Sequence, residues 1–171
     1  QTAKELSQEL QQNEDRISCI LVDYKQALRD AFRLCDEMVL QEFEKNRQEC
    51  PFDRQDSGST AAVVLVVNDT DIYCANAGDT EVVLLKSTGS LCVLSTLHKP
   101  NAIAETKRIE SAGGQVYTSR GISRVNGCLA VSRAFGNFTL TTYDGKRIVN
   151  SEPDVKKETV TEGDILVIAC D

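Results

Sequence analysis

The chain has 171 residues, of which 41% are hydrophobic and 26% are charged, and this length and composition predict one globular domain with a sizeable core. Its formal net charge of −7 argues against nucleic acid or an anionic membrane as a partner, since both attract basic surfaces. No apolar run approaches the roughly 20 residues of a membrane span.

The first fifty residues have the apolar pattern of helices. Apolar side chains recur at steps of three and four residues from Leu21 through Leu28 and Cys35 to Met38. This spacing predicts a long amphipathic helix whose broad apolar face lies against the rest of the domain. The polar segment 46–59, which contains proline and glycine, predicts a surface loop.

After Thr60 the pattern changes to short runs rich in β-branched residues. Turn-forming clusters such as NDTD (68–71) and GDT (78–80) separate these runs. Connections this short predict strands that are antiparallel neighbours. The continuous apolar run Ala61–Val67 predicts a strand that is covered on both faces.

The second half of the chain alternates one helix with further strands. A helix is expected after Pro100 and is ended by Gly113 and Gly114. Short strands are expected in GQVYT, ISRVNG and LAVS, and a buried strand in Ile165–Ala169. The order predicts an α+β fold in which helices cover the faces of the sheets.

The seven cysteines are scattered, with no Cys-x-x-Cys pair. Zinc sites and redox pairs need close pairs, so both are disfavoured. Cysteines such as Cys74 and Cys170 lie in apolar segments, where they are expected to act as small buried hydrophobes. Unpaired cysteines predict a reducing, cytoplasmic compartment. The chain has a single histidine, His98, which argues against hydrolysis by a Ser-His-Asp triad. We expect His98 to be structural or on the surface.

Two aspartates follow apolar strands at the points where the backbone leaves a sheet. These are Asp79 and Asp171. Carboxylates gathered at strand ends repel one another unless a cation lies among them, and Mg²⁺, Mn²⁺ and Ca²⁺ prefer such oxygen ligands. The alternative is that Asp79 only forms a turn and Asp171 only ends a strand.

Four arginines are candidates for binding a phosphate group. They are Arg108, Arg120, Arg124 and Arg133. Because the chain is acidic overall, a phosphorylated substrate would need such local arginines or metal cations. For any one of these side chains, solvent exposure or a salt bridge is the alternative.

Several segments resemble one known family in their order and spacing. They are SGSTAAVVLV, YCANAGDTEVVLL, HKPNAIAETKRIESAGGQV, SRVNGCLAVSRAFGN and DILVIACD. Together with the helical segment ALRDAFRLCDEMV, they resemble the metal-dependent (type 2C) protein serine/threonine phosphatases, from about Tyr24 to Asp171. The segment RVNGCLAVSRAFG is the most specific of them.

The resemblance implies an α-β-β-α sandwich, with two antiparallel sheets packed face to face and flanked by helices. It implies a binuclear Mg²⁺ or Mn²⁺ centre, where a metal-activated water attacks phosphoserine or phosphothreonine in protein substrates. On this mapping Asp171 is a ligand of the metal centre, and Asp79 matches an aspartate that helps to bind a third, weaker metal in some members. The residues 1–171 are then expected to form a single, partial domain.

The chain also departs from the family pattern. The family's Asp-Gly-His-Gly-Gly motif, the arginine before it and a late Asp-Asn motif are not among the 171 residues. Leu97 and Asn137 stand where the family usually has aspartates. We therefore expect a piece truncated at both ends, with exposed sheet edges, that either self-associates through such an edge or is marginally stable. Two hypotheses stay open: part of an active phosphatase, inactive alone, or a catalytically degenerate relative that acts as a binding module.

Overall fold

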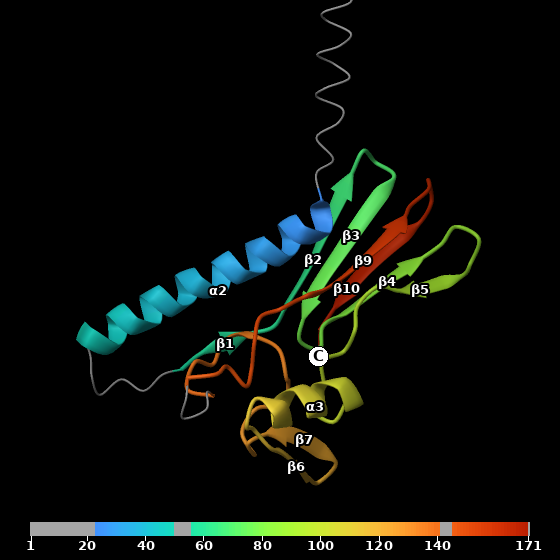
Figure 1. Cartoon of the computed structure of the whole chain (residues 1–171). Coiled ribbons are helices and arrows are strands. Elements are labelled where there is room, and N and C mark those ends of the chain that lie inside the picture. The colour runs from blue at the N-terminus through green and yellow to red at the C-terminus, as the bar shows by residue number, and fades with distance from the viewer. Residues whose placement is uncertain (1–22, 50–55, 141–144, 171) are drawn as a thin grey trace, which may run out of the picture.

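The computed structural model describes residues 23–49, 56–140 and 145–170. In these residues two antiparallel sheets of three strands pack face to face, and a long helix crosses one outer face (Figure 1). The helices are α2 (Tyr24–Glu49) and α3 (Ile103–Ser111). The strands are β1 (Gly58–Ser59), β2 (Ala61–Val67), β3 (Asp71–Ala77), β4 (Glu81–Leu85), β5 (Leu91–Val93), β6 (Val116–Ser119), β7 (Ile122–Val125), β8 (Phe135–Gly136), β9 (Asp154–Thr159) and β10 (Ile165–Ala169). The predicted α+β sandwich is confirmed.

The first sheet has the strand order β2-β3-β9. Strands β2 and β3 form a hairpin in which Val67 pairs with Asp71. In its three-residue turn 68–70, Asn68 and Asp69 both have positive φ, at 52° and 58°, a left-handed conformation that Asn and Asp tolerate better than most residues. Strand β9, which the sequence did not reveal as a strand, pairs with the other edge of β3.

The second sheet has the strand order β10-β4-β5. The expectation that β3 and β4 are neighbours is wrong, because the chain crosses from the first sheet to the second in the turn 78–80. Gly78 has a φ of 120° there, which a glycine adopts without the steric cost that a side chain would incur. The crossing sets Cys74 of β3 against Leu84 of β4 in the core between the sheets.

Helix α2 packs its apolar face on the outer face of the first sheet. The Asp23 carboxylate caps the helix by accepting hydrogen bonds from the backbone N–H groups of Lys25 and Gln26, both at 3.0 Å. Leu28 and Phe32 are buried against small residues of β3, which allow the helix to approach the sheet closely. The predicted amphipathic helix is confirmed.

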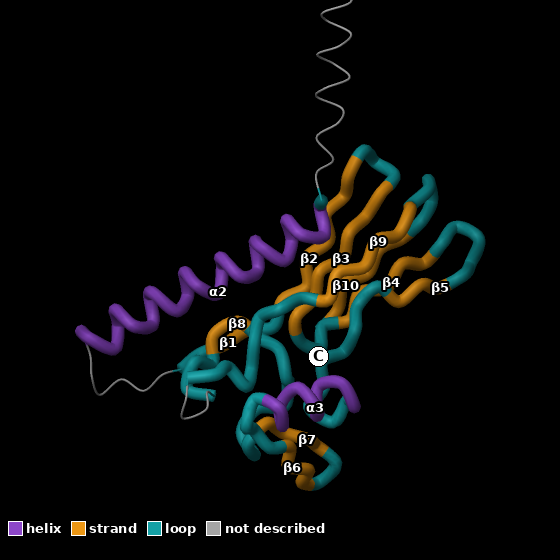
Figure 2. Tube along the Cα trace, viewed as in Figure 1, coloured by secondary structure: helices purple, strands orange, loops and turns teal. Residues whose placement is uncertain are grey.

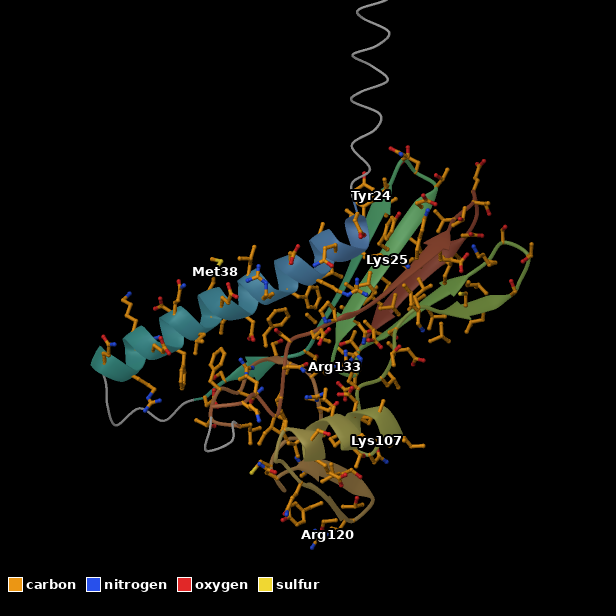
Figure 3. All side chains as sticks on the ribbon, viewed as in Figure 1. Tyr24, Lys25, Met38, Lys107, Arg120 and Arg133 are labelled. Atoms are coloured by element: carbon orange, nitrogen blue, oxygen red, sulfur yellow. The ribbon has the colours of Figure 1, made fainter. Side chains whose placement is uncertain are left out.

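The buried face of α2 is rotated from the predicted one. Cys35 and Met38 are exposed, and Met38 projects from the outer side of the helix (Figure 3). The buried face continues instead through Asp36, whose carboxylate accepts hydrogen bonds from the Gly136 N–H at 2.9 Å and from Arg147 at 3.0 Å. A buried polar residue with such partners is invisible to a search for apolar periodicity.

Strand β10 is exposed, although its apolar run predicts a buried strand. Its residues Ile165–Ile168 are 36–56% exposed, because β10 is the edge of its sheet. Leu166 pairs with the buried Leu84, yet the sandwich is open beside it. Strand β2 likewise forms an edge, and its Val66 is 55% exposed rather than covered on both faces.

The remaining elements form a smaller unit at one end of the sandwich (Figure 1). Helix α3 ends as predicted, with the N–H of Gly114 bonded to the carbonyl of Ile109, and strands β6 and β7 form a hairpin. Ile109, Val125 and Val149 share a core there. The segment LAVS forms only an isolated bridge between Leu129 and Val125 and is not the expected strand. Of the helices in the described ranges, none is long and apolar enough to cross a bilayer.

The cysteines follow the predicted role only in part. Cys74 is buried, and burial raises the pKa of its thiol to about 11, so this thiol is a poor nucleophile. Cys128 and Cys170 are exposed, which contradicts the expectation of a buried Cys170. All five cysteines within the described residues are free thiols. Cys19 and Cys50 lie outside the described residues.

Candidate functional site

Asp79 lies in the turn 78–80 that carries the chain from one sheet to the other. Its side chain is 20% exposed and forms an ion pair with the ammonium group of Lys99. Figure 2 shows this turn at the same end of the sandwich as the end of β10. Ala169 of β10 pairs with Glu81, two residues after Asp79. Asp79 therefore lies just after a strand end, as predicted, and the turn that contains it connects the two sheets.

The turn that carries Asp79 is held by the segment 96–98. The N–H of Gly78 donates a hydrogen bond to Nδ1 of His98 at 3.1 Å, and the N–H of His98 donates to the carbonyl of Gly78 at 2.9 Å. The Asn76 amide is bonded to both backbone groups of Thr96, at 2.8 and 3.0 Å. These paired bonds fix the position of the turn relative to the 96–98 segment.

His98 is a neutral, buried imidazole. Its side chain is 1% exposed, and burial, followed by the positive charge of Arg133, lowers its pKa, although Asp154 and Glu105 oppose this shift. Its Nε2 lies 3.4 Å from Oδ2 of Asp154 and makes no hydrogen bond within the described residues. The expectation that His98 is structural is consistent with this burial.

A buried carboxylate, Glu105, joins helix α3 to the strands. It accepts hydrogen bonds from Arg133 at 2.7 Å, from Arg108 at 2.9 Å and from the Ser132 hydroxyl at 2.6 Å. Burial by itself would raise the pKa of Glu105, but the bonds from Arg133, Ser132 and Arg108 outweigh burial and lower this pKa to about 2. Glu105 is therefore ionised at neutral pH.

The four arginines proposed as phosphate ligands do not gather at one place. Arg108 and Arg133 are both bound to Glu105, and Arg133 also contacts Asp154 at 3.2 Å (Figure 3). Arg124 donates to the carbonyl of Cys128 at 2.9 Å, and Arg120 lies at the β6–β7 turn, away from the sandwich (Figure 3). The salt-bridge alternative is confirmed for Arg108 and Arg133.

The described residues do not by themselves form a metal site. In the ranges 23–49, 56–140 and 145–170, no three His, Cys, Asp or Glu side chains come together in a way that could hold an ion. The carboxylate of Asp79 is paired with an ammonium group instead. Asp171, the other predicted ligand, lies outside the described residues.

The two departures from the family pattern have different surroundings. Asn137 has a φ of 52°, a left-handed conformation that both Asn and Asp adopt more readily than most residues. Leu97 is exposed, and nothing in the structure explains the apolar side chain there. Neither residue contacts Asp79 through a hydrogen bond or ion pair in the described part of the chain.

Sequence reasoning missed the residues that support the turn. Asn76 and Glu105 gave no functional signal, since their partners lie 20 and 28 positions away in the chain. The one local signal was the spacing of Glu105 and Arg108, because residues three apart on a helix can form an ion pair.

Comparison with known proteins agrees with this architecture. All of residues 1–171 match the family described as Protein phosphatase 2C. The chain is 41% identical over 152 residues to Probable protein phosphatase 2C 55 of Oryza sativa subsp. japonica, covering 88% of this chain and 36% of that protein. It is 39% identical over 154 residues to Protein phosphatase 2C homolog 2 of Schizosaccharomyces pombe, covering 87% of this chain and 38% of that protein.

A solved structure shares the fold. The structure described as a C. elegans sex determining protein superposes with a TM-score of 0.70 at 28% identity, covering 92% of this chain and 36% of that one. The chain thus spans less than two fifths of the length of each of these three proteins. On the family match over its full length and on these likenesses, the chain belongs to the protein phosphatase 2C family.

Proposed function

We propose that this chain serves in the hydrolysis of phosphoserine and phosphothreonine in proteins, with Mg²⁺ or Mn²⁺ as the cofactor. The family match supports this reaction class. The observation that carries the proposal in the structure is the position of Asp79, in a rigid turn at the crossing between the two sheets. Divalent ions supply such a reaction with an activated water and with charge stabilisation of the phosphoryl group.

We propose Asp79 and Asp171 as metal ligands. Asp171 follows Ala169 by two residues, and Asp79 precedes Glu81, the partner of Ala169, by two residues. For Asp79 to bind an ion, its ion pair with Lys99 must open. Two carboxylates are too few for a binuclear centre, so further ligands have to come from other residues.

Metal binding by the 171-residue chain tests this proposal. We expect weak Mn²⁺ binding, without turnover of a phosphopeptide, because the ligand set is incomplete. Asp79→Asn should weaken this binding by about tenfold or more, by analogy with the loss of supporting groups at metal sites. Calorimetric titration with Mn²⁺ measures the effect. Asp69→Asn is a matched control, because Asp69 is exposed in the turn at the other end of β3.

Two results would contradict this proposal, the first its incomplete ligand set and the second the assignment of Asp79 as a ligand. One is tight binding of two Mn²⁺ ions by this chain, with phosphopeptide hydrolysis that Asp171→Ala abolishes, which would show that the ligand set is complete. The other is Mn²⁺ binding that Asp79→Asn leaves unchanged. In the full-length protein, Mn²⁺-dependent hydrolysis that requires Asp171 would support the phosphatase, whereas a folded protein without hydrolysis would favour the binding module.

We also propose that the 171-residue chain associates with a second copy through the free edge of β10. The strand presents an apolar run with no charged or proline residue to blunt it. Val167→Lys should therefore convert an oligomer into a monomer in sedimentation velocity experiments. Ile103→Lys is the control, since Ile103 is exposed on α3, away from this edge. A monodisperse monomer of the unmodified chain would contradict the proposal.

We also propose a reducing, cytoplasmic compartment, which the free thiols of the described cysteines support.

A further inference from the structure

His98 connects three segments of the chain through its own atoms. Its Nδ1 and backbone N–H bond the two backbone groups of Gly78. Its carbonyl accepts a hydrogen bond from the N–H of Ser132 at 2.9 Å. The Ser132 hydroxyl, whose proton is donated to the closer Glu105 carboxylate, also lies 2.9 Å from this carbonyl. The turn that carries Asp79 and the segment before Arg133 are thus both fixed to this one residue.

The bond from Gly78 determines the tautomer of His98. Since Nδ1 accepts the N–H of Gly78 at 3.1 Å, Nδ1 must be unprotonated, and in the neutral ring the proton is on Nε2. Nε2 lies 3.4 Å from a carboxylate oxygen of Asp154 but makes no hydrogen bond within the described residues. A proton on Nδ1 would oppose the N–H of Gly78 and remove the bond that holds the turn.

We propose that His98 is a positioning residue for Asp79. Its unprotonated Nδ1 fixes the N–H of Gly78, so that the turn 78–80 presents the Asp79 carboxylate at the crossing between the sheets. The part of this inference that concerns metal binding rests on the proposed function, whereas the hydrogen bond and the tautomer do not.

The charged groups around the ring of His98 act in opposite directions on its protonation. Arg133 contributes positive charge, and Asp154 of β9 and Glu105 of α3 contribute negative charge. Both carboxylates are themselves paired with Arg133. Burial and the positive charge of Arg133 outweigh the two carboxylates and lower the pKa of His98, so the acceptor at Nδ1 is retained at neutral pH.

Two substitutions separate positioning from simple packing. In His98→Asn the side-chain oxygen can take the place of Nδ1 and accept the N–H of Gly78, although the side chain is smaller. His98→Leu fills more of the volume but has no acceptor. If His98 only packs, Leu should be the better replacement, since it leaves a smaller cavity and buries no polar group. If it positions the turn, Asn should be the better one.

The measurements are made on the 171-residue chain. Because His98 is the sole histidine, ¹⁵N spectra of the imidazole report on it alone, and we expect the Nε2–H tautomer at neutral pH in the unmodified chain. Hydrogen exchange at the Gly78 amide should be about tenfold faster in His98→Leu than in His98→Asn, the effect of losing one hydrogen bond. Mn²⁺ binding should be weaker in the Leu variant.

Each outcome decides the inference. A proton on Nδ1 in the unmodified chain would overturn it, and this measurement needs no variant to fold. Equal exchange at Gly78 in the two variants would also overturn it. Failure of the proposed function can be distinguished from failure of the positioning role, because in the first case Asp79→Asn would leave Mn²⁺ binding unchanged. Mn²⁺ binding that requires Asp79 but is equal in the two His98 variants would overturn the positioning role alone.

Discussion

Glu105→Gln is expected to lower the free energy of unfolding by about 3–5 kcal/mol, the usual effect of removing one partner from a buried ion pair. The side chain of Glu105 is 4% exposed and neutralises both Arg108 and Arg133. The glutamine can still accept a hydrogen bond, but it removes the carboxylate paired with the partly buried Arg108 and leaves Arg133 with Asp154 alone as counter-charge. Urea denaturation at neutral pH measures the loss.

The effect of Glu105→Gln should depend on pH. The pKa of Glu105 is lowered from 4.5 to about 2 in the folded chain, a difference equivalent to about 3 kcal/mol. A carboxyl group with a lowered folded-state pKa contributes stability that is fully present above its unfolded pKa and is lost as the pH falls through its folded pKa. The gap in stability between the unmodified chain and the variant should therefore narrow as the pH falls from 4.5 toward 2.

Glu110→Gln is the matched control for Glu105→Gln. Glu110 lies on the same helix but is exposed, so its substitution should change stability by less than about 0.5 kcal/mol. Similar losses for the two variants, or a gap for Glu105→Gln that does not change between pH 4.5 and 2, would show that the ion cluster around Glu105 does not stabilise the fold.

Gly78→Ala is expected to destabilise the chain by about 2–6 kcal/mol, because two costs add. The backbone φ of 120° is one that an L side chain rarely adopts, at a cost of about 1–3 kcal/mol. A Cβ at this position would also lie 2.2 Å from the Cγ2 atom of Thr60, and such overpacking costs about 1–3 kcal/mol more. Thermal unfolding measures the sum, and Mn²⁺ titration should show that binding at Asp79 weakens with it.

Gly89→Ala isolates the backbone cost. Gly89 has a φ of 87° in the β4–β5 hairpin, but a Cβ there meets no heavy atom within 4 Å. We expect this variant to lose about 1–2 kcal/mol, the cost of a left-handed conformation alone. If Gly78→Ala costs no more than Gly89→Ala, the close approach to Thr60 does not constrain the turn.

At the candidate site, the family pattern predicts the position of Asp79 but not the contacts that hold it. The sequence identifies Asp79 and its turn, and the resemblance assigns it to a metal centre. The sequence does not show that Lys99 pairs with Asp79 or that His98 holds Gly78. Each of these contacts joins residues 20 positions apart, and no local periodicity reports on a pair at that distance.

The sequence by itself determined the local elements. The steps of three and four residues predicted α2, Asn68 and Asp69 predicted the β2–β3 turn, and Gly113 predicted the end of α3, because each signal depends only on neighbouring residues and on the backbone conformations they allow.

Only the tertiary structure decided which surfaces are covered. In the folded chain, Asp36 is buried and Cys35 is exposed, and strand β10 is also exposed. The chain crosses to the second sheet at Gly78. An apolar run in the sequence indicates that a strand can be buried. Whether the strand is buried depends on which elements pack against it in the fold. Likewise, the ion pair between Glu105 and Arg133 forms only when folding brings these two distant residues together, so the sequence does not reveal it.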